Sequence, residues 1–269
     1  LRGLAEHIEA RGDFHRYTLY SVDAHFVQRF LNACHCSAFQ RVSWDSTRPE
    51  TLNPITETSG DPPFHIMMFD IDFSCTEGFP SPGDSPVAFR LRTTHEPGVS
   101  PTVRDQQSIV LMRDEFESLK AMLDALQSAL DIADPDVLLT RGGDQRLFPW
   151  LVEQAELHGM TLRLGRSSKP LVRSTNNRTV HSYGQTLHRH GAFFLEGRIH
   201  LDLRNSFIVN EGGVAGLFEL AQQSCQSAQI ISRLSPGSVI SAIQMRVAMD
   251  DGVLVPWKKN RPEDTKSAL

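Results

Sequence analysis

Long hydrophobic runs are missing from this chain of 269 residues. No uninterrupted apolar stretch approaches the ~20 residues that a helix needs to cross a bilayer, and nothing resembles a secretory leader. A strong excess of either charge is also missing, because the net charge of −5 gives no overall attraction to nucleic acid. These absences favour an ordinary globular protein, with one large domain or one domain and a smaller partner.

Cysteine is scarce, with only four residues in the chain. They form no disulfide framework, and Cys34-His35-Cys36 is followed by no second ligand pair at a zinc-finger spacing. We therefore expect reduced thiols in a cytosolic protein. Because the first residue is Leu1 rather than Met, we also expect an excised domain or a chain without its native start.

Two acids stand at the end of an apolar strand. Residues 64–73 read Phe-His-Ile-Met-Met-Phe-Asp-Ile-Asp-Phe. In an extended strand residues i and i+2 share a face, so Asp70 and Asp72 project together and repel unless a cation lies between them. Oxygen ligands suit Mg²⁺ or Mn²⁺. A divalent-metal site is one interpretation, and two solvated acids before the loop at Ser74 are the other.

Basic residues gather between residues 161 and 200, where the only acid is Glu196. The cations of this segment are Arg163, Arg166, Lys169, Arg173, Arg178, Arg189 and Arg198. A second basic cluster holds Lys258, Lys259 and Arg261. Such runs can bind phosphates even on an acidic protein, and a solvated loop face is the alternative. For the histidines of the first segment we favour nucleic-acid contact or packing over a metal site; they are His181, His188, His190 and His200.

Periodicity predicts an α/β core preceded by a loop over residues 45–63. The strands that we expect in and before this core lie at 17–22, 64–73, 87–92, 108–112 and 136–140, with antiparallel strands over 180–207. The helices that we expect lie at 26–31, from an N-cap at Asp114 to about Leu130, over 147–158 before Gly159, and through most of 214–251.

Four stretches resemble, in the right order, parts of one known family. Phe69-Asp70-Ile71-Asp72 is similar to a Phe-Asp-Ile-Glu motif, 134–151 to a strand–turn–helix, 197–203 to a further strand, and 232–256 to a connecting segment. Together they resemble the 3′–5′ exonuclease domain of family B DNA polymerases, and Tyr17-Thr-Leu-Tyr20 with Asp23 resembles the N-terminal domain of those enzymes. The Gly142-Gly143-Asp144 turn and the 218–221 helix most resemble the divergent archaeal-type branch, which has degraded catalytic motifs.

The resemblance implies a fold class and a division into domains. The fold would be α/β, with a ribonuclease H-like mixed sheet flanked by helices and a small β-rich N-terminal domain. We expect an N-terminal domain at 1–63, an exonuclease-like domain at 64–232 and a helical connector at 233–269. The connector would lead toward a palm domain, whose Asp-x-x-Ser-Leu-Tyr and Asp-Thr-Asp motifs have no counterpart in this sequence. The implied location is the cytoplasm, in association with the nucleoid, and the implied context is DNA replication or repair.

The resemblance also implies a two-metal chemistry that this sequence matches only in part. Four acids hold two metal ions in these exonucleases, and the first motif survives as Asp70 and Asp72. In the second motif Leu147 stands where the catalytic Asp belongs; Asp144 is a candidate replacement or else a helix N-cap. The third motif, Tyr-x-x-x-Asp, is missing between 202 and 232, where Glu219 is a stand-in or a surface residue. We therefore expect a degenerate catalytic set of Asp70, Asp72 and Asp144.

Three functions follow from these observations. We favour a DNA-binding, exonuclease-like module that binds a single strand or a primer terminus, with Trp150, Tyr183, Phe193 and Phe194 available for base stacking. Its candidate nucleic-acid contacts are Arg163, Arg166, Lys169, Arg173, Arg178, Lys258 and Lys259. The first alternative is an active Mg²⁺- or Mn²⁺-dependent exonuclease that uses Asp70, Asp72, Asp144 and either Asp202 or Glu219. The second is a structural subunit whose C-terminal helices dock a separate polymerase chain.

Overall fold

The computed structural model of the chain describes residues 2–13, 16–48, 51–55, 64–74, 84–94, 107–182 and 185–257. The chain forms two compact units. The first unit combines Leu1–Ser59, Glu219–Ser227 and Ser235–Leu269, and the second combines Gly60–Phe218 with Ala228–Leu234. Along the chain, the first boundary between the two units lies within residues 45–63, where the sequence predicts a loop or domain boundary.

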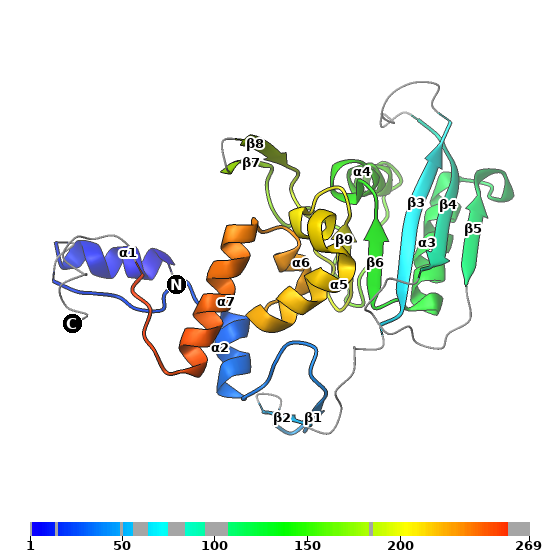
Figure 1. The fold of residues 1–269 in the computed structure, drawn as a ribbon. Coiled ribbons are helices and arrows are strands. Elements are labelled where there is room, and N and C mark those ends of the chain that lie inside the picture. Colours follow the sequence, from blue (N-terminus) through cyan, green and yellow to red (C-terminus); the bar gives the residue numbers. More distant parts are fainter. Residues whose placement is uncertain are drawn as a thin grey trace. The chain divides into compact units, whose positions relative to one another are not determined.

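A five-stranded mixed sheet organises the second unit, in the order β5-β4-β3-β6-β9 (Figure 1). Strand β3 (Ile66–Phe73) pairs antiparallel with β4 (Pro86–Thr93), which pairs antiparallel with β5 (Ser108–Met112). On its other side β3 pairs parallel with β6 (Val137–Thr140), and β6 pairs parallel with β9 (Ile199–Asp202). The predicted α/β class, with a ribonuclease H-like sheet flanked by helices, is confirmed.

Two helices cover one face of this sheet and build the core. The apolar stripe of α3 (Leu119–Ala133) and the first turns of α4 (Phe148–Leu157) pack on Met67, Phe69 and Ile71 of β3. Because side chains alternate along a strand, this burial fixes the opposite face of β3 for Met68, Asp70 and Asp72. The predicted metal-site acids therefore share a face, and that face lies away from the main core.

Helix α3 begins later than its sequence pattern predicts. Asp114 does not cap it; residues Arg113–Glu115 form a separate 3₁₀ turn, and Phe116 is extended. The N-cap is Ser118, whose side chain accepts the backbone N–H of Ala121 at 3.1 Å. A serine with extended backbone torsions suits this position as well as an aspartate does, so composition alone does not choose between them.

The predicted antiparallel strands over 180–207 are only partly confirmed. Strands β7 (Arg178–Ser182) and β8 (Gln185–Arg189) form an antiparallel hairpin of their own. Strand β9 instead joins the main sheet in parallel with β6. Strand β9 lies at the edge of the sheet, and its sequence Ile-His-Leu-Asp alternates apolar and polar residues, a pattern typical of an antiparallel strand. The chain continues as α5 (Phe207–Ser224), which is interrupted at Gly213, and α6 (Ala228–Ile231).

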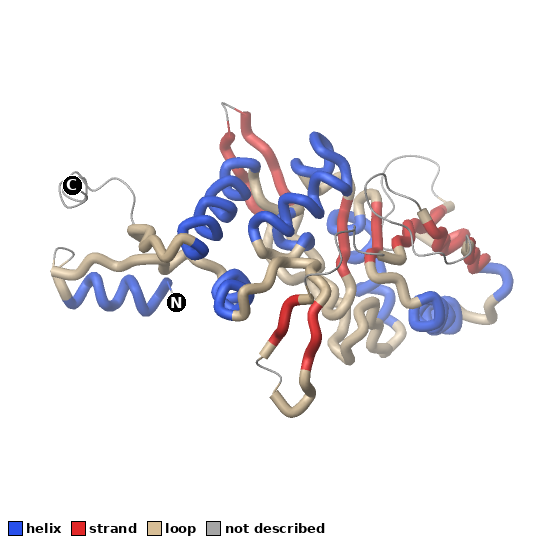
Figure 2. The backbone as a smooth tube through the Cα atoms, turned by 60° about the horizontal axis from the view of Figure 1, so that its bottom comes forward, coloured by secondary structure: helices blue, strands red, loops and turns tan. Residues whose placement is uncertain are grey.

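The first unit holds more helix than strand in its described residues, where the sequence predicts a β-rich domain. Its elements are α1 (Arg2–Arg11), α2 (Phe26–Ala33), β1 (Val42–Trp44), β2 (Leu52–Pro54) and α7 (Pro236–Asp250). The paired strands β1 and β2 are the two red segments at the bottom of Figure 2. The expected strand at 17–22 is reduced to a single bridge between Tyr20 and Pro256.

Helix α2 is tied to the C-terminal part of the first unit by its one buried residue. The amide of Gln28 donates to the carbonyl oxygens of Ser224, at 2.6 Å, and Ala242, at 3.0 Å. A buried amide that makes both donor bonds fixes the contact between segments that are far apart in sequence. Among the described residues, no helix combines the length and the apolar character needed to cross a membrane.

Candidate functional site

Asp70 and Asp72 lie on β3 and are half-buried. Nε of Arg90 lies 2.5 Å from Oδ2 of Asp72, and Arg90 is the register partner of Asp70 on the neighbouring strand. Oδ1 of Asp70 accepts the N–H of Ile71 at 2.9 Å. Two like charges on one face need a neighbouring cation, and here β4 supplies it as a guanidinium.

Asp202 lies across the sheet from Asp70. The register pairs Phe69 with Thr140 and Thr140 with Asp202, so all three share the face that carries the core. The carboxylate of Asp202 accepts three backbone N–H groups: those of Gly142 at 2.8 Å, Asp144 at 2.9 Å and Arg204 at 3.0 Å. Asp202 therefore holds the turn that follows β6 and is fully buried in doing so.

Asp144 lies in that turn, within the π-helical segment Gly143–Leu147, and it is fully buried. Its carboxylate accepts the N–H of Phe193 at 2.9 Å and the Nδ2 amide of Asn205 at 2.7 Å. Nη2 of Arg233 lies 2.7 Å from Oδ2 of Asp144, as an ion pair without hydrogen-bond alignment. The predicted N-cap role of Asp144 is wrong, because no side chain caps this turn.

His200 connects the turn to the strands from a fully buried position. Its Nδ1 lies 2.8 Å from the carbonyl oxygen of Phe193, and its Nε2 lies 2.9 Å from the hydroxyl of Thr140. A carbonyl can only accept, so Nδ1 carries the proton and Nε2 accepts from Thr140. Burial, and then the charge of Arg233, lower the pKa of His200 to about 3. The ring is therefore neutral near pH 7 and serves as a structural hydrogen-bonding group.

The described acids do not fit a two-metal centre. Within the described ranges no three His, Cys, Asp or Glu residues group closely enough to hold a metal ion. The sheet separates Asp70 and Asp72 from the face that carries Asp202, whose oxygens already accept protein donors. Leu147 lies in the core, and Glu219 is exposed on α5, where it accepts Gln223 at 3.1 Å. The alternative set with Asp202 is therefore not brought together within the second unit, and Glu219 belongs to the first unit.

The basic segment at 163–169 is neutralised by acids from elsewhere in the chain. Arg163 pairs with Asp131 at 3.0 Å. Arg166 pairs with Asp134 at 2.6 Å and with Asp136 at 2.8 Å, and Lys169 pairs with Glu196. Arg198 is buried and donates to the backbone carbonyls of Pro135, Leu164 and Leu130. Three of the balancing acids lie between 131 and 136, outside the window in which the segment looked basic.

Several other residues that the sequence predicts to contact nucleic acid lie in local contacts, in the core or outside the described residues. Arg173 lies over the ring of Phe193 at 5.2 Å and donates to Asn177 at 3.1 Å. Trp150 and Phe193 are only 4% and 2% exposed, so they belong to the core and cannot stack on bases. Phe194 is half-buried. Tyr183, Lys258 and Lys259 lie outside the described residues.

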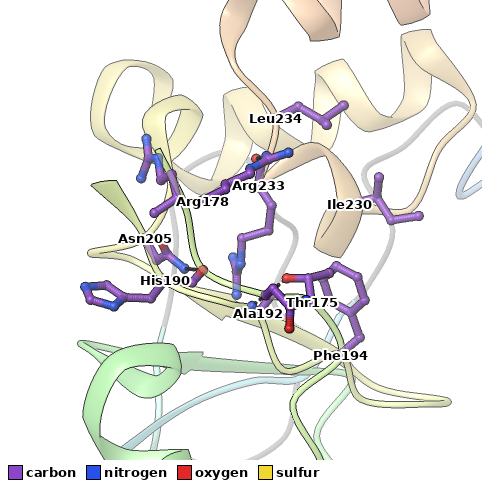
Figure 3. Close-up of a pocket in the computed structure, with 11 residues that line it drawn as sticks. Thr175, Arg178, His190, Ala192, Phe194, Asn205, Ile230, Arg233 and Leu234 are labelled. Carbon is purple, nitrogen blue, oxygen red and sulfur yellow. Dashed lines mark hydrogen bonds between the residues drawn. The ribbon is translucent and has the colours of Figure 1, made fainter. Parts of the chain in front are cut away.

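Three arginines of the second unit meet at one pocket, with a volume of about 280 Å³. Arg178 begins β7, Arg189 ends β8, and Arg233 follows α6. Figure 3 shows the guanidinium of Arg233 reaching toward Ala192, with Phe194 and Ile230 on the other side. We name this the arginine pocket, defined by Arg178, Arg189, Arg233, Ala192, Phe194 and Ile230.

Only Arg178 of the pocket was among the predicted contacts. Arg189 lies in the basic segment that the sequence revealed, and the equal spacing of Arg178 and Arg189 about the hairpin turn is the signal that could have paired them. Arg233 stands alone in Ser232-Arg-Leu, far from that segment, and no local pattern marks it.

Comparison with known proteins places these features in context. No family model matches the chain. A DNA polymerase of Thermococcus aggregans is 28% identical over 145 residues, which make up 54% of this chain and 7% of that polymerase. A DNA polymerase of Methanocaldococcus jannaschii is 21% identical over 187 residues, or 69% of this chain and 10% of that polymerase.

A solved structure shares the fold. The family B DNA polymerase of the hyperthermophilic archaeon Pyrobaculum calidifontis superimposes with a TM-score of 0.62 over 90% of this chain and 38% of its own, at 17% identity. The chain thus spans at most 10% of the curated polymerases that it matches. The sequence matches and the shared fold together support a domain derived from a family B DNA polymerase.

Proposed function

We propose that this chain is a DNA-binding, exonuclease-like module without 3′–5′ exonuclease activity. The main support for the proposed loss of activity is that the acids are separated. Asp70 and Asp72 occupy one face of the sheet, and Asp202 occupies the other. A two-metal mechanism needs its carboxylates to converge on ions about 4 Å apart. Of the acids that the structure describes, Asp70 and Asp72 would hold any Mg²⁺ or Mn²⁺ that binds on this face, and the ion would compete with Arg90 for Asp72.

DNA binding is supported by two observations. The relationship to DNA polymerases makes DNA the natural partner class. The cations of the 163–169 segment are paired with acids, whereas the arginine pocket contains arginines without such partners among the described residues. The proposed ligands are single-stranded or primer-template DNA, and the further proposed partner is a palm domain or a separate polymerase subunit. The division into 1–63, 64–232 and 233–269 belongs to this proposal.

A binding titration tests the DNA-binding half. The purified chain is titrated into a fluorescent single strand and into a primer-template, with anisotropy read at several salt concentrations, in EDTA and in Mg²⁺. We expect binding in EDTA, with log Kd rising linearly with log salt, because phosphate contacts release counterions. Absence of binding to either DNA at low salt would contradict the proposal.

A further inference from the structure

The two hairpin arginines are held opposite each other. Arg178 and Arg189 are register partners at the open end of the β7–β8 hairpin. Like charges directly opposite on neighbouring strands destabilise a hairpin, so such a pair needs compensation. Neither arginine forms an ion pair within the part of the chain that the structure describes. Arg178 donates to the carbonyl oxygen of Arg233, and the guanidinium of Arg189 lies over the ring of Phe207 at 3.3 Å.

Arg233 adds a third cation from a buried position. It is only 9% exposed, and its Nε has no hydrogen-bond acceptor among the described residues. One carboxylate, that of Asp144, is within ion-pair distance of it. No described acid lines the pocket itself. The buried acids Asp144 and Asp202 therefore balance the charge of Arg233, whereas no described acid pairs with Arg178 or Arg189.

The pKa of Arg189 reflects its burial and the repulsion between these arginines. Burial, and then the charges of Arg233 and Arg178, lower the pKa of Arg189 to about 10. The group remains cationic near pH 7, so the pocket carries uncompensated positive charge under physiological conditions. Removing one of these charges would relieve the repulsion, and so would an anion bound between them.

We propose that the arginine pocket binds a phosphate group of a nucleotide. Forked guanidinium donors match phosphate oxygens; Arg178 and Arg189 line the pocket from the hairpin, and Arg233 adds positive charge from its buried position. Phe194 and Ile230 line another side of the pocket and suit a sugar or base next to the phosphate (Figure 3). The volume of about 280 Å³ lies just below the common range for small-molecule pockets, which begins near ~300 Å³.

The phosphate has more than one available source. It is a strand phosphodiester, the 5′-terminal phosphate of a strand, or a free mononucleotide. The assignment to a DNA strand rests on the proposed function, whereas the assignment to phosphate chemistry rests on the pocket alone. The two are therefore tested by separate measurements.

The first measurement is the thermal stability of the whole chain in phosphate. Inorganic phosphate is compared with sodium chloride at the same ionic strength, for the wild type and for the double variant Arg178→Gln/Arg189→Gln. We expect phosphate to raise the Tm of the wild type and the double variant to lose most of that rise, because a ligand of the folded state stabilises it. The control Arg163→Gln/Lys169→Gln removes the same charge from residues already paired with acids, and should keep the rise.

The second measurement is DNA affinity with matched strands. One oligonucleotide carries a 5′-phosphate, the same oligonucleotide lacks it, and a nucleoside monophosphate competes. We expect the double variant to weaken binding about tenfold or more, as loss of charge-assisted contacts should. Its log Kd–log salt slope should fall by about 1.4, since each phosphate contact on a single strand contributes ~0.7. A preference for the 5′-phosphate identifies a terminal site, equal binding an internal one, and strong competition a free nucleotide.

The outcomes separate the two proposals. If phosphate leaves the Tm of the wild type unchanged while DNA binds equally to wild type and double variant, the pocket assignment is overturned and the proposed function stands. If the phosphate effect is present and variant-sensitive but DNA does not bind, the pocket stands and the DNA-binding proposal falls. The single variant Arg178→Gln changes an exposed residue, so it controls for unfolding of the double variant. It should show part of the phosphate effect and part of the loss of DNA affinity. Arg189→Lys keeps the charge without the fork and should weaken binding less than Arg189→Gln.

Discussion

The ion pair between Asp144 and Arg233 is deeply buried in the second unit. Its two partners are 0% and 9% exposed, so neither charge has access to bulk water if the other is removed. Desolvation makes an orphaned buried charge costly, even where the intact pair adds little net stability.

We expect Arg233→Met to lower the free energy of unfolding by about 3–5 kcal/mol, because it leaves the carboxylate of Asp144 buried without a cation. Urea unfolding measures the loss. The control is Arg163→Met, which breaks a half-exposed pair with Asp131 and should change the free energy by about 0–1 kcal/mol. Equal effects of the two substitutions would contradict the structural role of the buried pair.

The neutral state of buried His200 predicts a pH dependence of stability. Its pKa is about 3 in the folded chain and near 6.5 when the ring is exposed by unfolding, so below pH 6.5 the unfolded state binds the extra proton. The stability contribution of neutral His200 is complete above pH 6.5 and is lost as the pH falls toward 3.

Urea unfolding between pH 7.5 and 5 checks this prediction. The wild type should lose about 1.4 kcal/mol per pH unit more than His200→Gln in the lower part of that range, since one proton is taken up on unfolding. The exposed His188→Gln should follow the wild type. A His200→Gln profile parallel to that of the wild type would show that the ring is already protonated when folded.

The turn after β6 is the element that holds the buried network together. A Cβ at Gly143 would lie 2.2 Å from Oγ1 of Thr140 and 2.9 Å from Nε2 of His200. Glycine is therefore needed here for close approach, and the hydrogen bond between Thr140 and His200 depends on it.

We expect Gly143→Ala to destabilise the chain by about 1–3 kcal/mol, through overpacking at this turn. Thermal or urea unfolding measures the effect. Gly216→Ala is the matched control, since it places the same methyl group in α5, where nothing beyond the adjacent residues and the helix's own backbone lies within 4 Å. Alanine has the better helix propensity, so the control should stabilise by up to about 1 kcal/mol. Destabilisation by Gly216→Ala of similar size would contradict the packing at Gly143.

Elements with strong local signals could be predicted from the sequence. The strand at 108–112 and the helix before Gly159 follow apolar periodicity and a glycine stop, and both are present. The start of α3 and the pairing of β9 could not be predicted in the same way. Ser118 and Asp114 are equally good caps by type, and a four-residue strand at 199–202, with three buried residues, does not reveal which neighbour it pairs with.

The candidate site was predictable only where its residues are close in sequence. The shared face of Asp70 and Asp72 follows from strand geometry, whereas the partner of Asp72 is Arg90, eighteen residues away. The charge balance at 163–169 depends on acids at 131–136, and the arginine pocket depends on Arg233. Ion pairs between residues far apart in sequence determine which cations lack an acidic partner. A count of charges within one segment cannot show these pairs.

At the scale of the whole molecule, we propose that this polymerase-derived domain binds DNA without cutting it. The separation of Asp70 and Asp72 from Asp202, and the capture of Asp144 by Arg233, are the structural reasons. Binding and cleavage must therefore be followed in the same reaction.

The most direct test incubates the chain with 3′-labelled single-stranded DNA, at a protein concentration that binds all of it, in Mg²⁺, in Mn²⁺ and in EDTA. Gel analysis over time reports both the bound fraction and the length of the strand. We expect bound DNA of unchanged length in all three conditions, with Asp70→Ala identical to the wild type. Metal-dependent shortening that Asp70→Ala abolishes would contradict it.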